Sequence, residues 1–191
     1  MIRKKTVFYF EKPGIENTAD CVSVVKEAVR EHGYKHVVLA TTTGATAFAM
    51  GEALQGGGTN IVAVTHSAGF KEPNKTDLDH ETREKAVSLG IKVFTGPMLT
   101  HSLETSMNQK FGGVYPTMII AQSLKRFGEG SKVALEIVMM AADAGLIPEG
   151  EEVLAVAGTA HGADTVLLVR SAVSKRFLDL RVLEVLAKPR V

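Results

Sequence analysis

The chain has 191 residues, of which 45% are hydrophobic and 23% are charged, and its net charge is +1. These values are ordinary for a globular domain and exclude the strongly basic balance of a nucleic-acid-binding protein. No apolar run approaches the roughly 18 residues that a membrane-spanning helix needs. A lone cysteine, Cys21, excludes an internal disulfide and fits a reducing compartment. We therefore expect a cytoplasmic protein without membrane or nucleic-acid partners.

Strands and helices are predicted to alternate through the first half of the chain. The predicted strands are residues 6–10, 37–40, 60–65 and 91–95, chosen for their β-branched and apolar content. The predicted helices are residues 17–32, residues 45–55, and a third that is capped by Thr76 or Asp77 and ended by Gly90. Cys21 lies on the apolar stripe of the first helix, which indicates core packing. This alternation is typical of a mostly parallel sheet in a three-layer α/β/α fold.

The second half of the chain begins with a helical insertion, at about residues 100–145. We expect helices from residue 100 to 109, from Pro116 to Gly128, and from a Ser131 cap to Gly145. The apolar residues of this insertion predict self-association into a homo-oligomer. Residues 152–157 and 165–169 are predicted strands whose short connection requires an antiparallel hairpin. A last strand is expected at 180–186, and the whole chain, 1–191, is predicted to form a single α/β domain.

Ligands of open α/β sheets bind beyond the carboxyl ends of the strands. The loops expected at that edge are residues 11–17, 41–46, 66–70, 95–100 and 158–164. They are rich in Gly, Thr, Ser, Asn and His, and Lys12 and Lys71 are the only cations in them or beside them. Loops of this composition suit a ligand that has one phosphate group and a large uncharged body.

The turn from Thr41 to Thr46 joins an apolar strand to a helix. The amino end of a helix attracts anions because its N–H groups are unpaired and its dipole is positive there. The turn is neither a P-loop nor the GxGxxG fingerprint. Gly44 is predicted to lie where the backbone approaches a phosphate, and its replacement by valine is expected to leave the fold intact. The alternative is a plain connection whose threonines only cap the helix.

Three histidines, His66, His101 and His161, are expected at the same edge. They lie on separate loops without HExxH or CxxC spacing, so no metal site is predicted. His161 is a candidate ligand contact or general acid/base, and the alternative is an ordinary loop residue. Asp164 either contacts the ligand or only shapes its loop.

Two segments resemble the carboxyl-terminal α/β domain of pyruvate kinases: VVLATTTGATAFAMGEAL (37–54) and GEEVLAVAGTAHGADTVLLV (150–169). In those kinases such a turn holds the phosphate of an allosteric sugar bisphosphate. The segments FEKPGIENT, ATTTGATA, THSAGF and VAGTAHGADT are more narrowly similar to stand-alone archaeal-type proteins of this fold. That resemblance implies bound flavin mononucleotide (FMN) and an unassigned biochemical role. The kinase barrel is missing from the chain, so pyruvate kinase activity is not expected, while a flavin-dependent redox role stays open.

We therefore predict that the chain binds FMN, or a similar phosphorylated ligand, at the carboxyl edge of the sheet. One alternative is a regulatory module that senses a phosphorylated metabolite without catalysis, and another is a small hydrolase using His161 and Asp164, which lacks a nucleophile. Candidate neighbours of a flavin ring are Phe70, Phe94, Phe111 and Tyr115. The residues predicted to bind the cofactor are Glu11, Asn17, Thr41, Thr42, Thr43, Gly44, Ala45, Thr46, Ser67, Gly69, Phe70, Thr95, Gly96, Gly158, Thr159, His161, Gly162 and Asp164.

Overall fold

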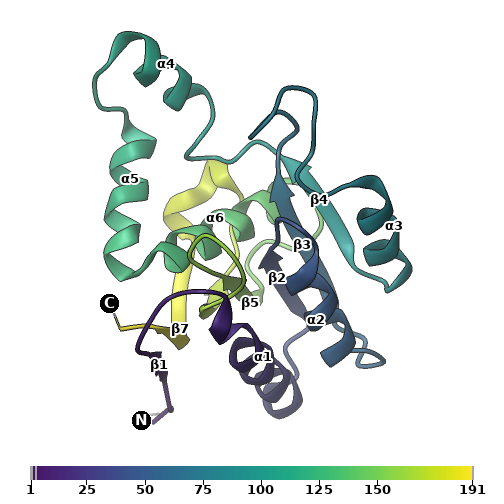
Figure 1. The fold of residues 1–191 in the computed structure, drawn as a ribbon. Helices are drawn as coiled ribbons and strands as arrows, with labels where there is room; N and C mark the ends of the chain where they lie inside the picture. The colour runs from purple at the N-terminus through teal and green to yellow at the C-terminus, as the bar shows by residue number, and fades with distance from the viewer. Residues whose placement is uncertain (1, 3, 191) are drawn as a thin grey trace.

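One mixed sheet organises the computed structural model, which describes residue 2 and residues 4–190 (Figure 1). The order across its seven strands is β1-β7-β6-β5-β2-β3-β4, and every neighbouring pair is parallel except the two that include β6. The mostly parallel α/β fold predicted from the sequence is confirmed. The strands are β1 (Phe8–Phe10), β2 (His36–Ala40), β3 (Asn60–His66), β4 (Lys92–Gly96), β5 (Glu152–Ala157), β6 (Thr165–Arg170) and β7 (Arg181–Pro189).

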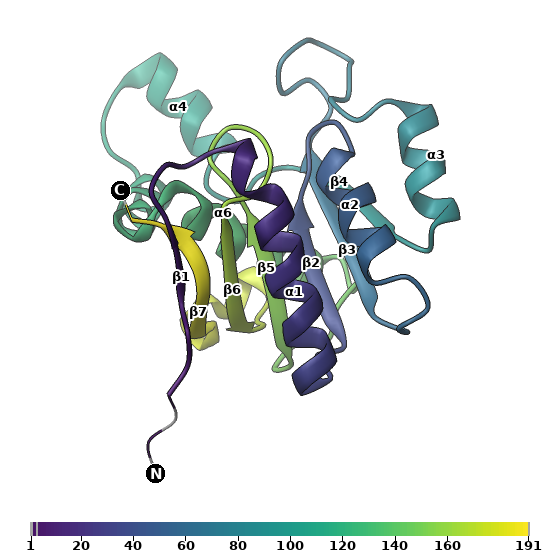
Figure 2. The ribbon, with the colours of Figure 1, turned by 60° about the horizontal axis from the view of Figure 1, so that its bottom comes forward.

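Helices cover both faces of this sheet. α1 (Thr18–His32), α2 (Ala45–Ala53) and α3 (His80–Ser88) pack on one face, and α1 and α2 lie in front of the sheet in Figure 2. α6 (Glu129–Asp143) packs on the other face. Since successive side chains of a strand point to opposite faces, Val37 and Leu39 join the first helical layer and Val38 joins α6. Burial on both sides explains why the central strands are continuous apolar runs.

The predicted C-terminal hairpin is confirmed. β5 and β6 pair antiparallel from Glu152–Arg170 to Ala157–Thr165. β7 is antiparallel to β6 and so returns to the direction of β5, and β1 joins it at the edge of the sheet. β1 and the end of β7 therefore lie side by side (Figure 1).

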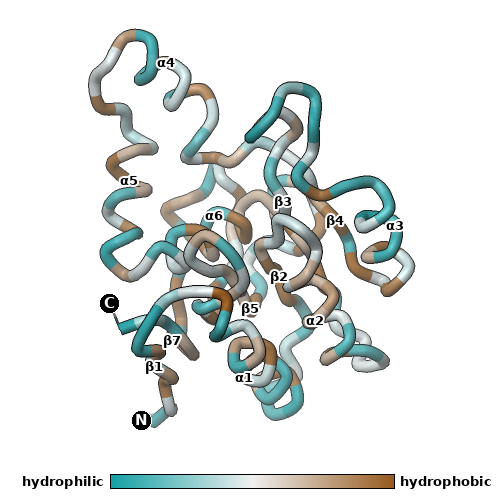
Figure 3. Tube along the Cα trace, viewed as in Figure 1, coloured by the Kyte–Doolittle hydropathy of each residue, from teal (hydrophilic) through white to brown (hydrophobic). Residues whose placement is uncertain are grey.

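The predicted start of α3 is wrong. The helix begins at His80, and its cap is Asp79, whose side chain accepts a hydrogen bond from the N–H of Thr82 at 2.8 Å. Asp77 instead bonds the ring of His66, which makes it unavailable as a cap. The loop before α3 and α3 itself are mostly hydrophilic in Figure 3, and the helix buries only Ala86.

The predicted starts of the first and third helices of the insertion are also wrong. α4 covers Leu103–Phe111, because Thr100 is buried and both its N–H and its hydroxyl bond Glu136. α6 begins at Glu129, and the Ser131 hydroxyl donates back to the carbonyl of Phe127 rather than capping the helix. The start of α5 (Pro116–Leu124) at Pro116 is confirmed.

An arm made of α4, α5 and the short η2 (Lys125–Phe127) projects from the body of the molecule (Figure 1). It carries large apolar side chains that face outward, namely Leu103, Met107, Phe111, Val114, Ile119 and Phe127. Self-association through this segment stays a prediction. In the described part of the chain, each helix falls short of the length and apolar character that crossing a bilayer requires.

Cys21 lies in the core between α1 and the sheet and has no exposed surface. Burial, aided by the negative charge of Asp164, raises the pKa of its thiol to about 12. A thiol that stays protonated is a poor nucleophile, and the prediction that Cys21 packs in the core is confirmed.

Asp164 ties the hairpin loop to the amino-terminal segment. It is fully buried, and one of its oxygens accepts hydrogen bonds from the N–H groups of Gly14 at 3.1 Å and Thr159 at 3.0 Å. Its other oxygen accepts the hydroxyl of Thr165 at 2.8 Å. Of the two roles predicted for Asp164, the structure favours that of shaping its loop.

We expect Asp164→Ala to lower the free energy of unfolding by about 2–4 kcal/mol, because it leaves buried donors without an acceptor. Urea denaturation followed by circular dichroism measures this. Asp20→Ala is the control, since it removes an exposed carboxylate of α1 and is expected to cost under about 1 kcal/mol. Equal stability of the two variants would contradict the anchoring role of Asp164.

Candidate functional site

A cavity of about 510 Å³ lies at the carboxyl edge of the sheet, between the amino end of α2 and the middle of α6. It is lined by the ends of β2 and β3, the turn that opens α2, the hairpin loop between β5 and β6, η1 (Ile15–Asn17) and α6. The lining residues that the sequence predicted are Thr41, Thr42, Thr43, Ala45, Thr46, Phe70, Gly158, His161 and Gly162.

The remaining predicted residues lie outside this lining. They are Glu11, Asn17, Gly44, Ser67, Gly69, Thr95, Gly96, Thr159 and Asp164. Several of them have partners elsewhere: the Asn17 amide donates to the carbonyls of Lys12 and Gly14, and the Thr95 hydroxyl accepts from Arg83. These residues shape the loops around the cavity.

Gly44 faces away from the cavity, toward α3. Its N–H donates to the Thr41 hydroxyl at 3.0 Å, and a Cβ atom added to it would lie 2.6 Å from Thr82. Its φ of +90° is strained for any other residue. The expectation that Gly44→Val leaves the fold intact is therefore wrong.

The amino end of α2 supplies unpaired N–H groups to the cavity. Within the described chain, no acceptor takes a hydrogen bond from the N–H groups of Thr42, Thr43, Ala45 or Thr46. The first helical hydrogen bond runs from the N–H of Phe48 to Gly44. Unpaired N–H groups at a helix start favour a bound anion.

Thr65 adds a hydroxyl that was not predicted from the sequence. It lies at the end of β3, lines the cavity and is only 2% exposed. Among the described residues, its oxygen is the buried side-chain atom that has no hydrogen-bond partner. Buried hydroxyls are normally paired, so this oxygen needs an explanation, and its position beside the α2 turn points to a ligand.

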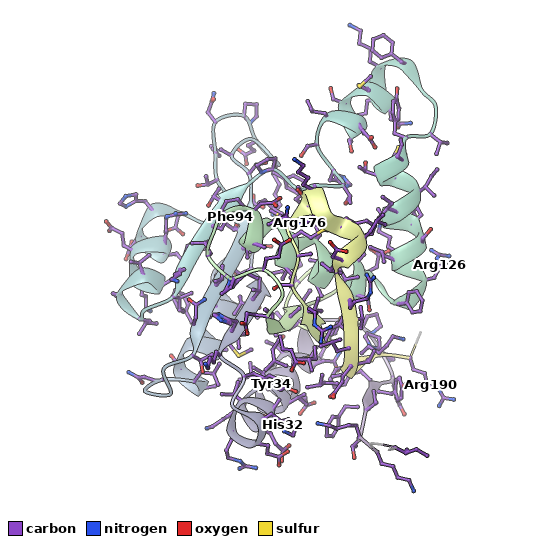
Figure 4. All side chains as sticks on the ribbon, turned by 180° about the vertical axis from the view of Figure 1, so that it is seen from behind. His32, Tyr34, Phe94, Arg126, Arg176 and Arg190 are labelled. Atoms are coloured by element: carbon purple, nitrogen blue, oxygen red, sulfur yellow. The ribbon has the colours of Figure 1, made fainter. Side chains whose placement is uncertain are left out.

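The wall opposite the α2 turn is apolar. It is built by residues of α6, of the ends of β2 and β3, and of the segment after β4, namely Val133, Ile137, Met140, Ala40, Val64 and Met98. Phe70 lies at the rim, with its ring centroid 4.2 Å from that of His66. Of the other predicted ring neighbours, Phe94 packs on the α6 face of the sheet (Figure 4), and Phe111 and Tyr115 belong to the arm.

A buried ion pair joins Lys132 to Glu136, a residue of the cavity lining. Lys132 and Glu136 are 6% and 3% exposed, and the Lys132 ammonium donates to Glu136 at 2.6 Å. The other carboxylate oxygen accepts both donors of Thr100 at 2.7 Å, so Glu136 fastens the segment after β4 to α6. A sequence signal for this pair exists: Glu136 is a single acidic residue within the apolar stretch of α6, and it follows Lys132 by four residues.

Histidines approach the cavity from two sides without forming a metal site. His66 and His161 line it, and His101 lies near Phe70 at 6.4 Å between ring centroids. The described residues contain no group of three or more His, Cys, Asp or Glu side chains arranged to hold a metal ion. His161 is exposed on the hairpin loop, where Gly162 has a positive φ of 72°.

Fold and cavity together define an α/β domain with a cavity at the carboxyl ends of its parallel strands. The family model of the pyruvate kinase alpha/beta domain matches residues 19–169. The chain therefore belongs to this family.

Similar solved structures include pyruvate kinases of Cryptosporidium parvum. One is 16% identical with a TM-score of 0.44, over 83% of this chain and 23% of that chain. A second is 15% identical with a TM-score of 0.42, over 84% and 23%. A third, in complex with ADP, is 14% identical with a TM-score of 0.42, over 83% and 24%. The matched region is thus about a quarter of each pyruvate kinase chain.

We expect Lys132→Met to lower the free energy of unfolding by about 3–5 kcal/mol at neutral pH, since it leaves the Glu136 carboxylate buried without a counter-ion. Adding Glu136→Gln to that variant is expected to restore much of the loss, because Gln is uncharged and still accepts from Thr100. Chemical denaturation measures both.

Lys125→Met is the matched control for Lys132→Met. Lys125 pairs with Glu129 at the same spacing of four residues, but Glu129 is 49% exposed. Pairs of that kind contribute less than about 1 kcal/mol. If Lys132→Met were no more destabilising than Lys125→Met, the buried pair would not hold α6 to the segment after β4.

Proposed function

We propose that the chain binds a phosphorylated small molecule in the cavity, with the phosphate at the amino end of α2, and that FMN is this molecule. The observation that carries the proposal is the convergence of unpaired donors: four backbone N–H groups of the α2 turn and the Thr65 hydroxyl. A phosphate has several strong acceptor oxygens and satisfies such a set in one step.

The cavity fits a molecule with a phosphate at one end and a flat, largely apolar body. Its volume of about 510 Å³ lies inside the range of roughly 300–1,000 Å³ that small-molecule pockets occupy. Donors gather at the α2 turn, and aliphatic side chains of α6 form the opposite wall. The pair of Phe70 and His66 at the rim offers flat surfaces for a ring system.

FMN is preferred among phosphorylated molecules because of the segments that resemble the FMN-associated proteins. All four of them, FEKPGIENT, ATTTGATA, THSAGF and VAGTAHGADT, contribute residues to the cavity lining. When bound, FMN would supply electron-transfer chemistry, while the protein would hold its phosphate and cover its ring. In this proposal the residues of the chain bind the ligand and take no part in its chemistry.

A regulatory module that senses a phosphorylated metabolite without catalysis is the second candidate. The composition of the lining favours it: among the described residues, those that line the cavity include no Lys, Arg, Ser or Cys. These residue types supply most nucleophiles and cationic electrophiles of hydrolases and transferases. The two candidates share the phosphate site and differ in the body of the ligand.

Spectroscopy of the purified protein tests FMN directly. We expect a yellow preparation that releases FMN on denaturation, and apoprotein that binds FMN at least about tenfold more tightly than riboflavin because the phosphate adds charge-assisted hydrogen bonds. Ala45→Asp is expected to abolish this preference by placing a carboxylate at the phosphate position, and the neutral Ala45→Asn is its matched control. If sugar phosphates raised the melting temperature and FMN did not, the second candidate would replace the first.

Thr65→Val tests whether the unpaired hydroxyl serves the ligand. Removing a buried hydroxyl without a partner is expected to raise the free energy of unfolding of the ligand-free protein by about 1 kcal/mol, while weakening FMN binding. Thr41→Val is the control. It is expected to lower the free energy of unfolding, because the Thr41 hydroxyl accepts a hydrogen bond from the N–H of Gly44. Unchanged FMN affinity in Thr65→Val, measured by calorimetric titration, would remove Thr65 from the site.

A further inference from the structure

A histidine and a carboxylate are paired at the rim of the cavity. His66 ends β3, and its Nδ1 lies 2.7 Å from a carboxylate oxygen of Asp77, in the loop before α3. The ammonium of Lys71 lies 3.3 Å from the same oxygen. Asp77 is 10% exposed and His66 is 28% exposed, so the pair is shielded from water while the ring still borders the cavity.

The partners of Asp77 fix which nitrogen of His66 carries the proton. Burial alone would raise the pKa of Asp77, but hydrogen bonds from His66 and Lys71 outweigh it and hold this pKa below its usual value. Asp77 is therefore a carboxylate, which only accepts hydrogen bonds, and Nδ1 of His66 is the donor. The remaining nitrogen, Nε2, is an acceptor in the neutral ring and becomes a donor only when the ring gains a second proton.

His66 is a direct neighbour of the α2 turn. Ala40 of β2 pairs with Val64 of β3, and the N–H of Thr41 donates to the carbonyl of Val64 at 2.9 Å. Adjacent strands lie about 4.8 Å apart, so the residues that follow Val64 run beside those that follow Ala40. His66 and the unpaired N–H groups of Thr42 and Thr43 consequently border the same cavity.

The charged groups that the structure describes around the cavity offset one another and leave no positive charge to balance a bound phosphate. The titratable residues that line it are His66, His161 and Glu136. Glu136 is neutralised by Lys132, and the charge of Asp77 is offset by Lys71. A phosphate monoester carries about −1.5 to −2 charges at neutral pH, and the N–H and hydroxyl donors of the site are neutral.

We propose that His66, oriented by Asp77, is the cationic contact of the phosphate and that binding of a phosphate monoester is accompanied by uptake of a proton at its Nε2. The inference rests on the proposed phosphate site and adds to it a specificity residue and a pH dependence. With Lys71 offsetting Asp77, a protonated His66 gives this cluster a net charge of +1, opposite to that of the ligand. The Phe70 ring packs against the His66 ring at a tilt of 31°, and because Asp77 holds Nδ1, Nε2 is the nitrogen available to a ligand.

Calorimetric titration with FMN in buffers of different ionisation enthalpy measures the proton uptake. For the parent protein at pH 7.5 we expect FMN binding with net uptake of protons and an affinity that falls as the pH rises. His66→Gln is expected to lose the uptake and to weaken FMN binding about tenfold or more, the scale of one charge-assisted hydrogen bond. His101→Gln is the matched control: His101 lies near Phe70 but outside the cavity lining, and its replacement should keep both properties.

A second readout does not depend on the variants. Nitrogen-15 spectra of the imidazole groups, recorded without ligand and at saturation with FMN at the same pH, should show that the doubly protonated form of His66 gains population on binding. FMN binding without proton uptake, or uptake that survives in His66→Gln, would overturn this inference and leave the phosphate site standing. If the parent bound neither FMN nor inorganic phosphate, the phosphate site itself would fail, and the role of His66 with it.

Discussion

The parallel pairing of β2 with both β3 and β5 is the constraint on which the site depends. Leu39 pairs with Val156 and Ala40 with Val64, so the three strands end at nearly the same level. The turn into α2, the end of β3 and the hairpin loop are thereby brought to one place, although they are far apart in the sequence. Because both faces of these strands are buried by helices, polar groups can gather only beyond their ends.

Much of the fold could be predicted from the sequence, because strand and helix periods are local properties. The short connection after Ala157 was enough to require the antiparallel hairpin. The helix starts near Asp77 and Thr100 could not be predicted in the same way. Both residues are plausible caps by local rules, but each is bound by a partner from another element, His66 and Glu136 respectively. A hydrogen bond to a residue far away in the sequence stabilises a side chain about as much as helix capping does, so the local capping preference no longer decides where the helix starts.

The part of the site that is built from loops beyond the strand ends could be predicted from the sequence. Residues of the α2 turn and of the hairpin loop line the cavity, whereas Asn17, Thr95 and Asp164 are engaged in hydrogen bonds with other groups of the protein. Polar residues are abundant in both roles, and composition does not separate them. The α6 wall was missed for a different reason: a helix that covers a sheet face looks like core in the sequence, and its contact with the cavity depends on where the sheet ends.

The distribution of charge explains why neutral donors dominate the cavity. Lys132 lies close by, but it is paired with Glu136, whose other carboxylate oxygen holds the segment after β4. In the proposed site, an anion would meet backbone N–H groups and a hydroxyl, which the fold fixes before any ligand arrives. Leaving the Thr65 hydroxyl unpaired lowers the stability of the ligand-free protein. A ligand that supplied the missing acceptor would recover this free energy on binding, so under this proposal the same atom that weakens the empty domain would strengthen its complex.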